Sequence, residues 1–234
     1  MSGMKTVVVF SGAGMSAESG IDTFRDGGGL WEQHRVEDIA TPDAWNRTPD
    51  LVTRFYNERR KVIIGANPNK AHHDIANMEH LANVHIVTQN IDDLHERAGS
   101  TSVHHLHGNI RYSKSSGPNQ EKDFFQIDGA ELGAADLCPD GYRLRPHVVW
   151  FGENVPAYES AVLILNEADI LIVVGTSLQV HPAAGLIQFA SEAEQKFIVD
   201  PNADSLAVPN DFIRVNKGAS EGFAFILDKL KSIP

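Results

Sequence analysis

A glycine pattern directly after a short apolar strand constrains the fold of this chain more than any other feature. Residues 6–10 form an apolar, β-branched run, which predicts a buried strand of a parallel sheet. Gly12, Gly14 and Ala17 follow in a G-x-G-x-x-A pattern. Gly12 would allow a tight turn, Gly14 would let the backbone approach a phosphate, and Ala17 would let a helix pack closely on the strand. The pattern predicts a dinucleotide-binding turn, in which N–H groups at a helix N-terminus face a pyrophosphate.

The same glycines would also fit a strand–helix turn that binds no ligand. Two features favour a ligand: residues 19–21 add a second turn, and Arg25 within Phe24-Arg25-Asp26 adds a cation just beyond it. A common dehydrogenase would continue into a regular helix and place an acid after a second strand, about 20 residues later. Residues 26–31 instead predict a flexible loop. We therefore expect a dinucleotide site that closes over its ligand in a different way.

Composition is that of an ordinary globular protein. The 234 residues are 42% hydrophobic and 22% charged, which suits one large domain or one domain with a small insertion. The net charge of −11 argues against nucleic acid as a partner. No apolar run approaches the length of a membrane span, and no signal-peptide pattern is present, so we expect a cytoplasmic protein without a membrane partner. A single cysteine, Cys138, excludes an intrachain disulfide and a multi-cysteine metal site within one chain.

Strand and helix patterns alternate along the rest of the chain. Short apolar runs predict strands at 85–88, 170–174 and 197–200. Helical patterns are expected at 41–45, 50–64, 71–81, 160–169 and 220–230, with a further helix starting near 180. The alternation predicts an α/β fold with a doubly wound, mostly parallel, Rossmann-like sheet. Residues 112–145 break the pattern, and their polar composition predicts an irregular insertion with one short hairpin near 124–127.

Polar side chains collect where the predicted strands end. Residues 89–92 follow the strand at 85–88, as expected for a ligand crevice, although a strand–helix loop with an Asp N-cap would look similar. Residues 175–177 follow the strand at 170–174 and predict a second phosphate- or ribose-binding turn. Asp200 ends the next strand, where an acid can accept hydrogen bonds from ribose hydroxyls or simply start a turn.

Three histidines, His104, His105 and His107, lie close together in the chain. One of them could be a general base, because an imidazole titrates near pH ~6.5. Taken singly, each is more often a loop or surface residue. A zinc site built from all three would need a spacing that is not typical.

Five segments agree in order and content with one family: GAGMSAESGIDTFRD, TQNIDDLHERAG, HLHGN, RPHVVWFGE and GTSLQVHPAAG. Together they resemble the sirtuins, the NAD-dependent protein deacylases, from Val7 to about Ser220. The resemblance implies that NAD is a co-substrate, that acylated lysine in proteins or peptides is the partner, and that the products are nicotinamide and O-acyl-ADP-ribose. It also implies an NAD-binding domain of residues 1–30, 70–108 and 146–234, and a small inserted module of residues 31–69 and 109–145.

The resemblance implies roles for individual residues. His107 matches the catalytic base, whereas His104 and His105 do not match it. Asn90 and Asp92 match the catalytic-site residues that hold the ribose and the nicotinamide carboxamide. The matching NAD contacts are Gly12, Ala13, Gly14, Ser16, Phe24, Arg25, Trp31, Gln89, Asn90, Ile91, Asp92, Gly175, Thr176, Ser177, Asp200 and Ala219. The matching acyl-lysine contacts are Val149, Phe151, Gly152, Glu153 and Val180, with the substrate added as a strand between 152–153 and 178–180.

Two departures from the family pattern have consequences. Sirtuins usually carry two Cys-x-x-Cys pairs in the segment that corresponds to 112–145, but Cys138 is the only cysteine here. We therefore predict that zinc is absent and that this segment is mobile. Sirtuins often have Asn where this chain has Asp200. The carboxylate can still accept hydrogen bonds from the ribose of NAD, but it should repel NADP.

Tyr56 and Arg59 match the Tyr-x-x-Arg pattern of sirtuins that act on malonyl- and succinyl-lysine. At i and i+3 they share one helix face, and a hydroxyl beside a guanidinium can bind a carboxylate. An aromatic anchor beside a solvated arginine would look the same without the resemblance. The resemblance thus favours a desuccinylase and demalonylase that also acts on acetyl groups. An ADP-ribosyltransferase on the same scaffold and a non-catalytic sensor of NAD or ADP-ribose are the alternatives, and the intact His107 favours deacylation.

Overall fold

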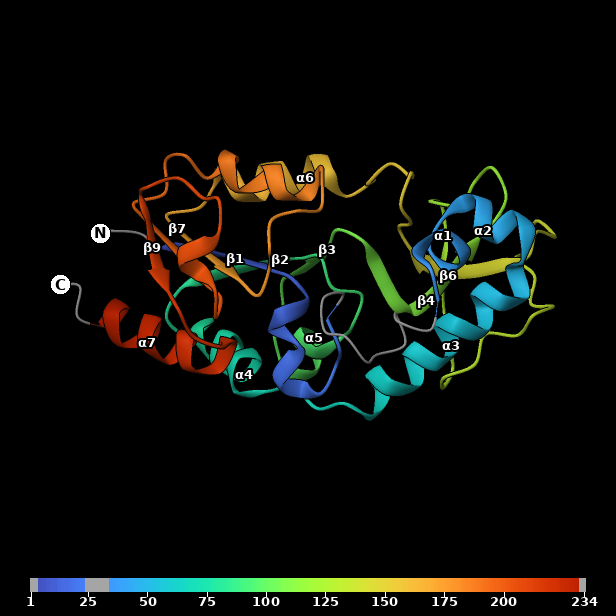
Figure 1. Cartoon of the computed structure of the whole chain (residues 1–234), viewed down its shortest axis with the longest axis horizontal. Coiled ribbons are helices and arrows are strands. Elements are labelled where there is room, and N and C mark those ends of the chain that lie inside the picture. Colours follow the sequence, from blue (N-terminus) through green and yellow to red (C-terminus); the bar gives the residue numbers. More distant parts are fainter. Residues whose placement is uncertain (1–3, 24–33, 232–234) are drawn as a thin grey trace.

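A six-stranded, fully parallel sheet forms the larger part of the molecule. The computed structural model describes residues 4–23 and 34–231. The strands lie in the order β3-β2-β1-β7-β8-β9 (Figure 1). Their bounds are Thr6–Ser11 for β1, Asn83–Thr88 for β2, Val103–His105 for β3, Ile170–Val174 for β7, Gln195–Val199 for β8 and Phe212–Val215 for β9. The strands predicted at 6–10, 85–88, 170–174 and 197–200 lie in this sheet as β1, β2, β7 and β8, whereas β3 and β9 were not predicted.

Helices cover both faces of this sheet, as a doubly wound fold requires. Alternate residues of β1 point to opposite faces, so Val7 and Val9 join one buried cluster while Val8 and Phe10 join the other. The first cluster packs against α4 (Lys70–Met78) and α7 (Ala219–Lys231). The second packs against α6 (Tyr158–Asn166) and the 3₁₀ helix Ala183–Phe189. Figure 1 shows α6 on one side of the sheet and α4 and α7 on the other.

The turn after β1 differs from the predicted helix start. Two short 3₁₀ helices, Ala13–Met15 and Ala17–Ser19, follow the strand. Gly20 ends the second one with φ +80, a left-handed conformation that glycine adopts without strain. The helix expected near 180 is likewise 3₁₀, at Ala183–Phe189. Two short 3₁₀ helices thus follow β1 at the place where a dehydrogenase would form one long helix.

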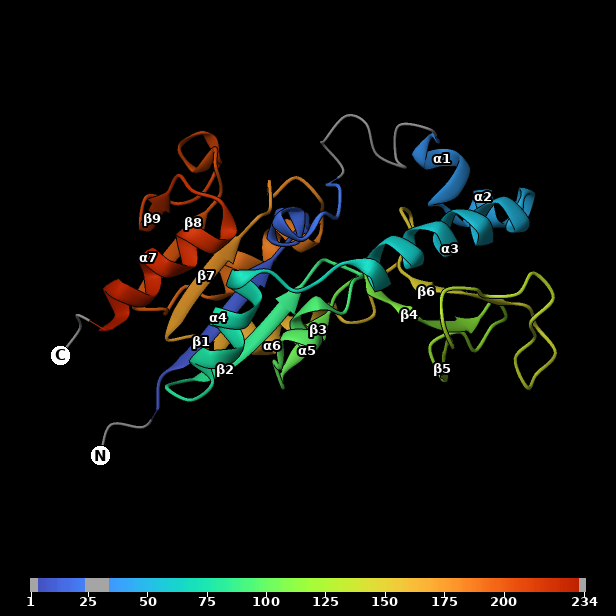
Figure 2. The same cartoon turned by 90° about the horizontal axis from the view of Figure 1, so that it is seen from below.

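A smaller module lies at the end of the molecule away from both termini (Figure 2). Its helices are α1 (Val36–Ile39), α2 (Pro42–Arg47) and α3 (Pro49–Gly65). An antiparallel sheet in the order β5-β4-β6 completes it, with β4 at Gly108–Ser115, β5 at Phe124–Gln126 and β6 at Leu144–Val148. Because β6 pairs with β4, the module extends to Val148, past the boundary of 145 predicted from sequence.

The polar segment 112–145 is more regular than its composition predicted. The hairpin expected near 124–127 is present as β4 and β5, and β6 adds a third strand. Ile127, Leu132, Cys138 and Leu144 form a small buried cluster within this segment. The predicted mobility of this segment stays a prediction. Among the described residues, no helix is both long and apolar enough to cross a membrane. The remaining helix, α5 (Leu94–Ala98), follows β2 and borders the site.

Candidate functional site

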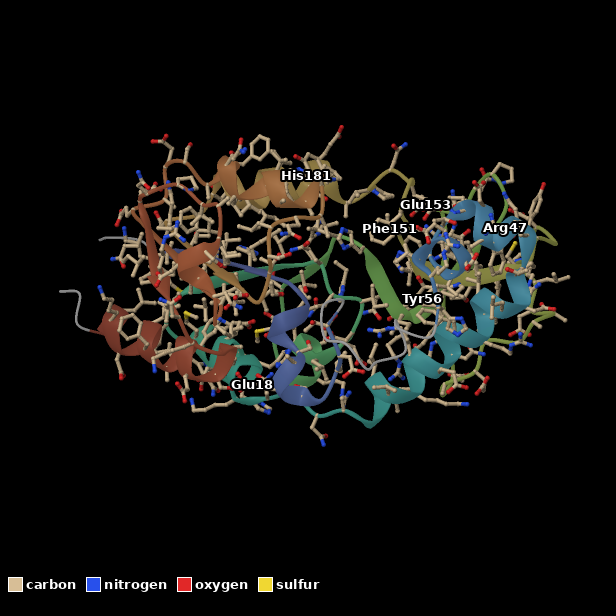
Figure 3. All side chains as sticks on the ribbon, viewed as in Figure 1. Glu18, Arg47, Tyr56, Phe151, Glu153 and His181 are labelled. Carbon is tan, nitrogen blue, oxygen red and sulfur yellow. The ribbon has the colours of Figure 1, made fainter. Side chains whose placement is uncertain are left out.

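A cavity of about 450 Å³ lies between the large sheet and the small module. From β1 the chain passes to β2 and β3 on one side, whereas β7, β8 and β9 lie on the other. The cavity therefore opens at the carboxyl ends of the strands where the order reverses, which is the usual ligand position in such sheets. Figure 3 shows Tyr56, Phe151 and Glu153 on the small-module side and His181 on the sheet side.

The structure brings most of the predicted site residues to this one cavity. From the NAD set it is lined by Gly12, Ala13, Gly14, Ser16, Gln89, Asn90, Ile91, Asp92, Gly175, Thr176, Ser177 and Asp200, and the predicted base His107 lines it too. From the acyl-lysine set it is lined by Tyr56, Arg59, Val149, Phe151, Gly152, Glu153 and Val180. Ala219 is buried at the start of α7 and does not line the cavity. Phe24, Arg25 and Trp31 lie outside the described residues.

The glycines of the turn after β1 and of the turn after β7 pack against each other. The N–H of Gly14 donates to the carbonyl of Gly175 at 2.8 Å. A Cβ on Gly14 would lie 2.8 Å from the Cα of Gly175, and a Cβ on Gly175 would lie 2.2 Å from the backbone nitrogen of Met15. Gly175 also has φ +60. Close contact between the two turns therefore requires glycine here, whether or not a phosphate also approaches the backbone.

A chain of polar side chains crosses the floor of the cavity. The amide of Asn90 donates to the hydroxyl oxygen of Ser16 at 3.1 Å, and this hydroxyl donates to Asp92 Oδ2 at 3.0 Å. The other carboxylate oxygen of Asp92 accepts the N–H of Leu94 at 3.2 Å. The alternative interpretation expected an Asp N-cap, but the N-cap residue of α5 is Asp93, whose side chain makes no capping hydrogen bond. Burial raises the pKa of Asp92, which is 5% exposed.

His107 has the geometry of a general base. Its Nδ1 lies 3.0 Å from the carbonyl oxygen of Gln89. A carbonyl only accepts, so Nδ1 carries the proton and Nε2 of the neutral ring carries the free electron pair. Burial lowers the pKa of His107 below its ordinary value, so the ring is neutral at pH 7. Within the described part of the chain, Nε2 has no hydrogen-bond partner, and His107 lines the cavity.

Tyr56 and Arg59 enter the cavity from α3. The indole Nε1 of Trp150 donates to the Tyr56 hydroxyl oxygen at 3.1 Å, and both side chains are buried. Burial raises the pKa of Tyr56, so its phenol is neutral. Burial also lowers the pKa of Arg59, but a guanidinium remains charged at neutral pH.

Arg145 and Trp150 organise the wall of the cavity, and sequence reasoning gave them no role. Arg145 holds both carboxylate oxygens of Glu153, at 2.6 and 2.9 Å, and its guanidinium lies 3.4 Å above the Trp150 ring. Glu153 Oε2 also accepts the backbone N–H of Trp150 at 2.7 Å. Burial would raise the pKa of Glu153, but Arg145 outweighs burial and the pKa is lowered. The only signal in the sequence was that both residues belong to the RPHVVWFGE segment.

The three neighbouring histidines do not converge on a metal. His104 Nε2 lies 2.9 Å from the carbonyl of Ala157, on the α6 side, whereas His105 and His107 face the 89–90 loop. In residues 4–23 and 34–231, no three His, Cys, Asp or Glu side chains come together as metal ligands would. With only Cys138 in segment 112–145, the donor set does not fit a tetrahedral zinc site. The absence of zinc stays a prediction.

The fold and the site define an α/β protein with a nucleotide-sized cavity at the reversal point of its sheet and a histidine base in that cavity. The chain belongs to the Sir2 family, whose model matches residues 12–182. An NAD-dependent protein deacylase of Bacteroides thetaiotaomicron is 45% identical over 223 residues, covering 94% of this chain and 95% of that protein. An NAD-dependent protein deacylase of Helicobacter pylori is 44% identical, covering 97% of this chain and 96% of that protein.

Solved structures agree with this assignment. A crystal structure of a Sir2 homologue with NAD superposes with a TM-score of 0.85 at 36% identity, covering 97% of this chain and 90% of that one. The resemblance to the sirtuins is therefore confirmed, and so is the α/β, mostly parallel fold. The protein is an NAD-dependent protein deacylase.

Proposed function

We propose that this deacylase removes the acidic acyl groups succinyl and malonyl from lysine, with acetyl as a further substrate. The observation that carries the proposal is that Tyr56 and Arg59 line the same cavity as His107. A carboxylate is costly to bury unless it is paired and hydrogen-bonded. An enclosed cationic and hydroxyl pair therefore selects acyl groups that end in a carboxylate.

Trp150 makes Tyr56 a donor toward the substrate. An indole N–H can only donate, so the Tyr56 oxygen accepts from Trp150 and its own proton is directed elsewhere. Since the phenol is neutral, that proton is retained at neutral pH. Tyr56 and Arg59 then present only hydrogen-bond donors to the acyl group, as a carboxylate requires because it only accepts hydrogen bonds.

The remaining roles follow from the cavity. NAD supplies an electrophilic ribose carbon that the acyl oxygen attacks as nicotinamide leaves. The Nε2 atom of His107 accepts a proton from a ribose hydroxyl, which then attacks the acyl carbon. Asn90 and Asp92 orient the ribose and the carboxamide. One water molecule then adds at the acyl carbon as the lysine amine leaves, so the products are free lysine, nicotinamide and O-acyl-ADP-ribose.

Asp200 is expected to select NAD over NADP. It lines the cavity, and its Oδ1 accepts the backbone N–H of Asn202 at 2.8 Å. A second negative charge on the adenosine ribose would be repelled by this carboxylate.

Matched acetyl-, malonyl- and succinyl-lysine peptides, each mixed with NAD, test the proposal by mass spectrometry of the released lysine peptide. Arg59→Met and Tyr56→Phe should each slow succinyl removal roughly ten- to hundredfold, the value of a hydrogen bond to a charged group. Acetyl removal should change little. Arg54→Met is the matched control, because Arg54 is exposed on the same helix.

Other outcomes would point elsewhere. Removal of acetyl alone, with no effect of Arg59→Met on selectivity, would refute the acid-acyl proposal. Binding of NAD without turnover of any peptide would favour the ADP-ribosyltransferase or sensor alternative.

A further inference from the structure

Four successive backbone carbonyls, at residues 88–91, are held by the facing segment 105–110. The two outer carbonyls accept backbone N–H groups of that segment, each at 2.9 Å. The two inner carbonyls, of Gln89 and Asn90, instead accept hydrogen bonds from Nδ1 of His107 and of His105, each at 3.0 Å. Two histidines at i and i+2 thus hold neighbouring carbonyls of one loop. His107 is the base, and His105 has no role so far.

The surroundings of His105 require both ring nitrogens to donate. Its Nδ1 faces the Asn90 carbonyl, and its Nε2 lies 2.7 Å from Glu96 Oε1. Both partners are acceptors, so the ring is an imidazolium when Glu96 is ionised. The amide nitrogen of Asn109 lies farther from Nε2, at 3.3 Å. His107 has one such partner and is neutral, so the two rings differ in charge because of their partners.

The loop that His105 holds carries two side chains of the site. Asn90 donates to Ser16, and Ser16 donates to Asp92, so the position of the Asn90 backbone sets the positions of both polar groups. We propose that His105, held by Glu96, is a positioning residue for deacylation that fixes the Asn90 carbonyl and thereby orients Asn90 and Asp92 toward NAD. The inference rests on the roles proposed above for Asn90 and Asp92.

The charged groups around His105 support an imidazolium. Burial disfavours the charged ring, but the Glu96 carboxylate, a backbone carbonyl and the Asp92 charge outweigh burial, and the pKa of His105 is raised. His95 and His147 also face this region. Burial lowers the pKa of His95 well below its ordinary value and that of His147 to about 4. Both therefore lose their protons at a lower pH than His105 does, so they do not change charge in the range in which His105 deprotonates.

Three variants separate the two hydrogen bonds of the ring. His105→Asn places an amide donor near the Nδ1 position and keeps the hydrogen bond to the Asn90 carbonyl. His105→Gln places its amide near the Nε2 position, so it reaches Glu96 but loses the hydrogen bond to the Asn90 carbonyl. His104→Gln is the matched control, since His104 contacts α6 and not the loop. We expect His105→Gln to raise the KM for NAD about tenfold, with the KM for the acyl peptide changed less than about twofold. His105→Asn should recover most of the loss.

The pH profile distinguishes positioning from general destabilisation. Wild-type kcat/KM for NAD should fall as the pH rises through the raised pKa of His105, and Glu96→Gln should move this fall to lower pH. His105→Asn should lack this fall, because an amide does not titrate. An unchanged KM for NAD in His105→Gln, or an equal rise in the KM of NAD and peptide, would overturn the inference. Asn90→Ala serves as reference: if it too leaves NAD kinetics unchanged, the proposed role of the loop is wrong, not only that of His105.

Discussion

Arg60 is expected to be the main polar link within the small module. It is fully buried on α3 and donates to the carbonyl of Ile110 at 2.7 Å, to Asn57 Oδ1 at 2.7 Å and to the carbonyl of Ala130 at 2.8 Å. It therefore joins the helix both to β4 and to the 130–132 loop. These bonds tie together parts of the small module that are distant in the chain.

The cost of Arg60→Met can be estimated from these contacts. Three hydrogen bonds from a charged donor contribute about 1.5–3 kcal/mol each. Burial opposes them: it lowers the pKa of Arg60 to about 10, and a shift from 12.5 corresponds to about 3 kcal/mol. Methionine fills part of the space but leaves the carbonyls of Ile110 and Ala130 without this donor. We expect the free energy of unfolding to fall by about 3 kcal/mol, because the three lost hydrogen bonds outweigh the burial cost that methionine relieves.

Urea unfolding at pH 7 measures this change, and the midpoint should fall by roughly 1 M. Arg54→Met is the control on the same helix, and its exposed side chain should give a change within about 0.5 kcal/mol. If Arg60→Met lost no more stability than Arg54→Met, the assignment of Arg60 as a stabilising link would be wrong.

Three further predictions concern pH, specificity and metal content. Burial lowers the pKa of His72 to about 4, whereas in the unfolded chain it titrates at its ordinary pKa of 6.5. As the pH falls from 6.5 to 4, the unfolded chain therefore binds a proton that the folded chain does not, and the free energy of unfolding should drop by about 3 kcal/mol. His72→Gln keeps an acceptor for the N–H of Asn69 but does not titrate, so urea unfolding from pH 7 to 4 should show a shallower loss, and an equal loss would contradict the reasoning. Trp150→Phe removes the hydrogen-bond donor to Tyr56 and should lower the ratio of succinyl to acetyl removal rates about fivefold. Trp45→Phe, which changes the adjacent ring, is the control. If Trp150→Phe lowered the rates on the succinyl and acetyl peptides equally, the argument that Trp150 orients the Tyr56 proton would be wrong. Chelator treatment should leave activity and Tm unchanged, and elemental analysis should find far less than one zinc per chain; stoichiometric zinc would refute the prediction of a zinc-free module.

The fold was predictable where local pattern and burial agree. The run at 6–10 and the apolar strand at 170–174 are hydrophobic throughout because both faces of the parallel sheet are covered, and such runs are recognisable in a sequence. The strand β3 was missed because Val103–His105 is short and ends in two histidines. The strand β9 was missed because Phe212–Val215 is also short and contains an arginine.

The site was predictable at the level of which segments meet, since carboxyl ends of parallel strands meet at one edge. The turn after β1 was harder, because it ends at Gly20 in a left-handed conformation that depends on the local backbone. The role of Trp150 depends on a contact with Tyr56, which is distant in the chain, and the roles of Arg145 and His105 depend on how the backbone between them and their partners folds back. Spacing along a sequence carries no information on such contacts.

The central position of β1 also has a consequence for how the chain folds during synthesis. Val7 pairs with Val84 on one side and with Ile170 on the other, so the first strand made is among the last to be enclosed. At about 5–20 residues per second, a ribosome needs roughly ten to thirty seconds to reach β7 after making β1. Throughout that interval, one edge of an apolar strand is open to other chains. Nascent chains that stop before residue 170 should therefore aggregate, and cellular factors that bind exposed apolar segments should associate with this protein until β7 emerges.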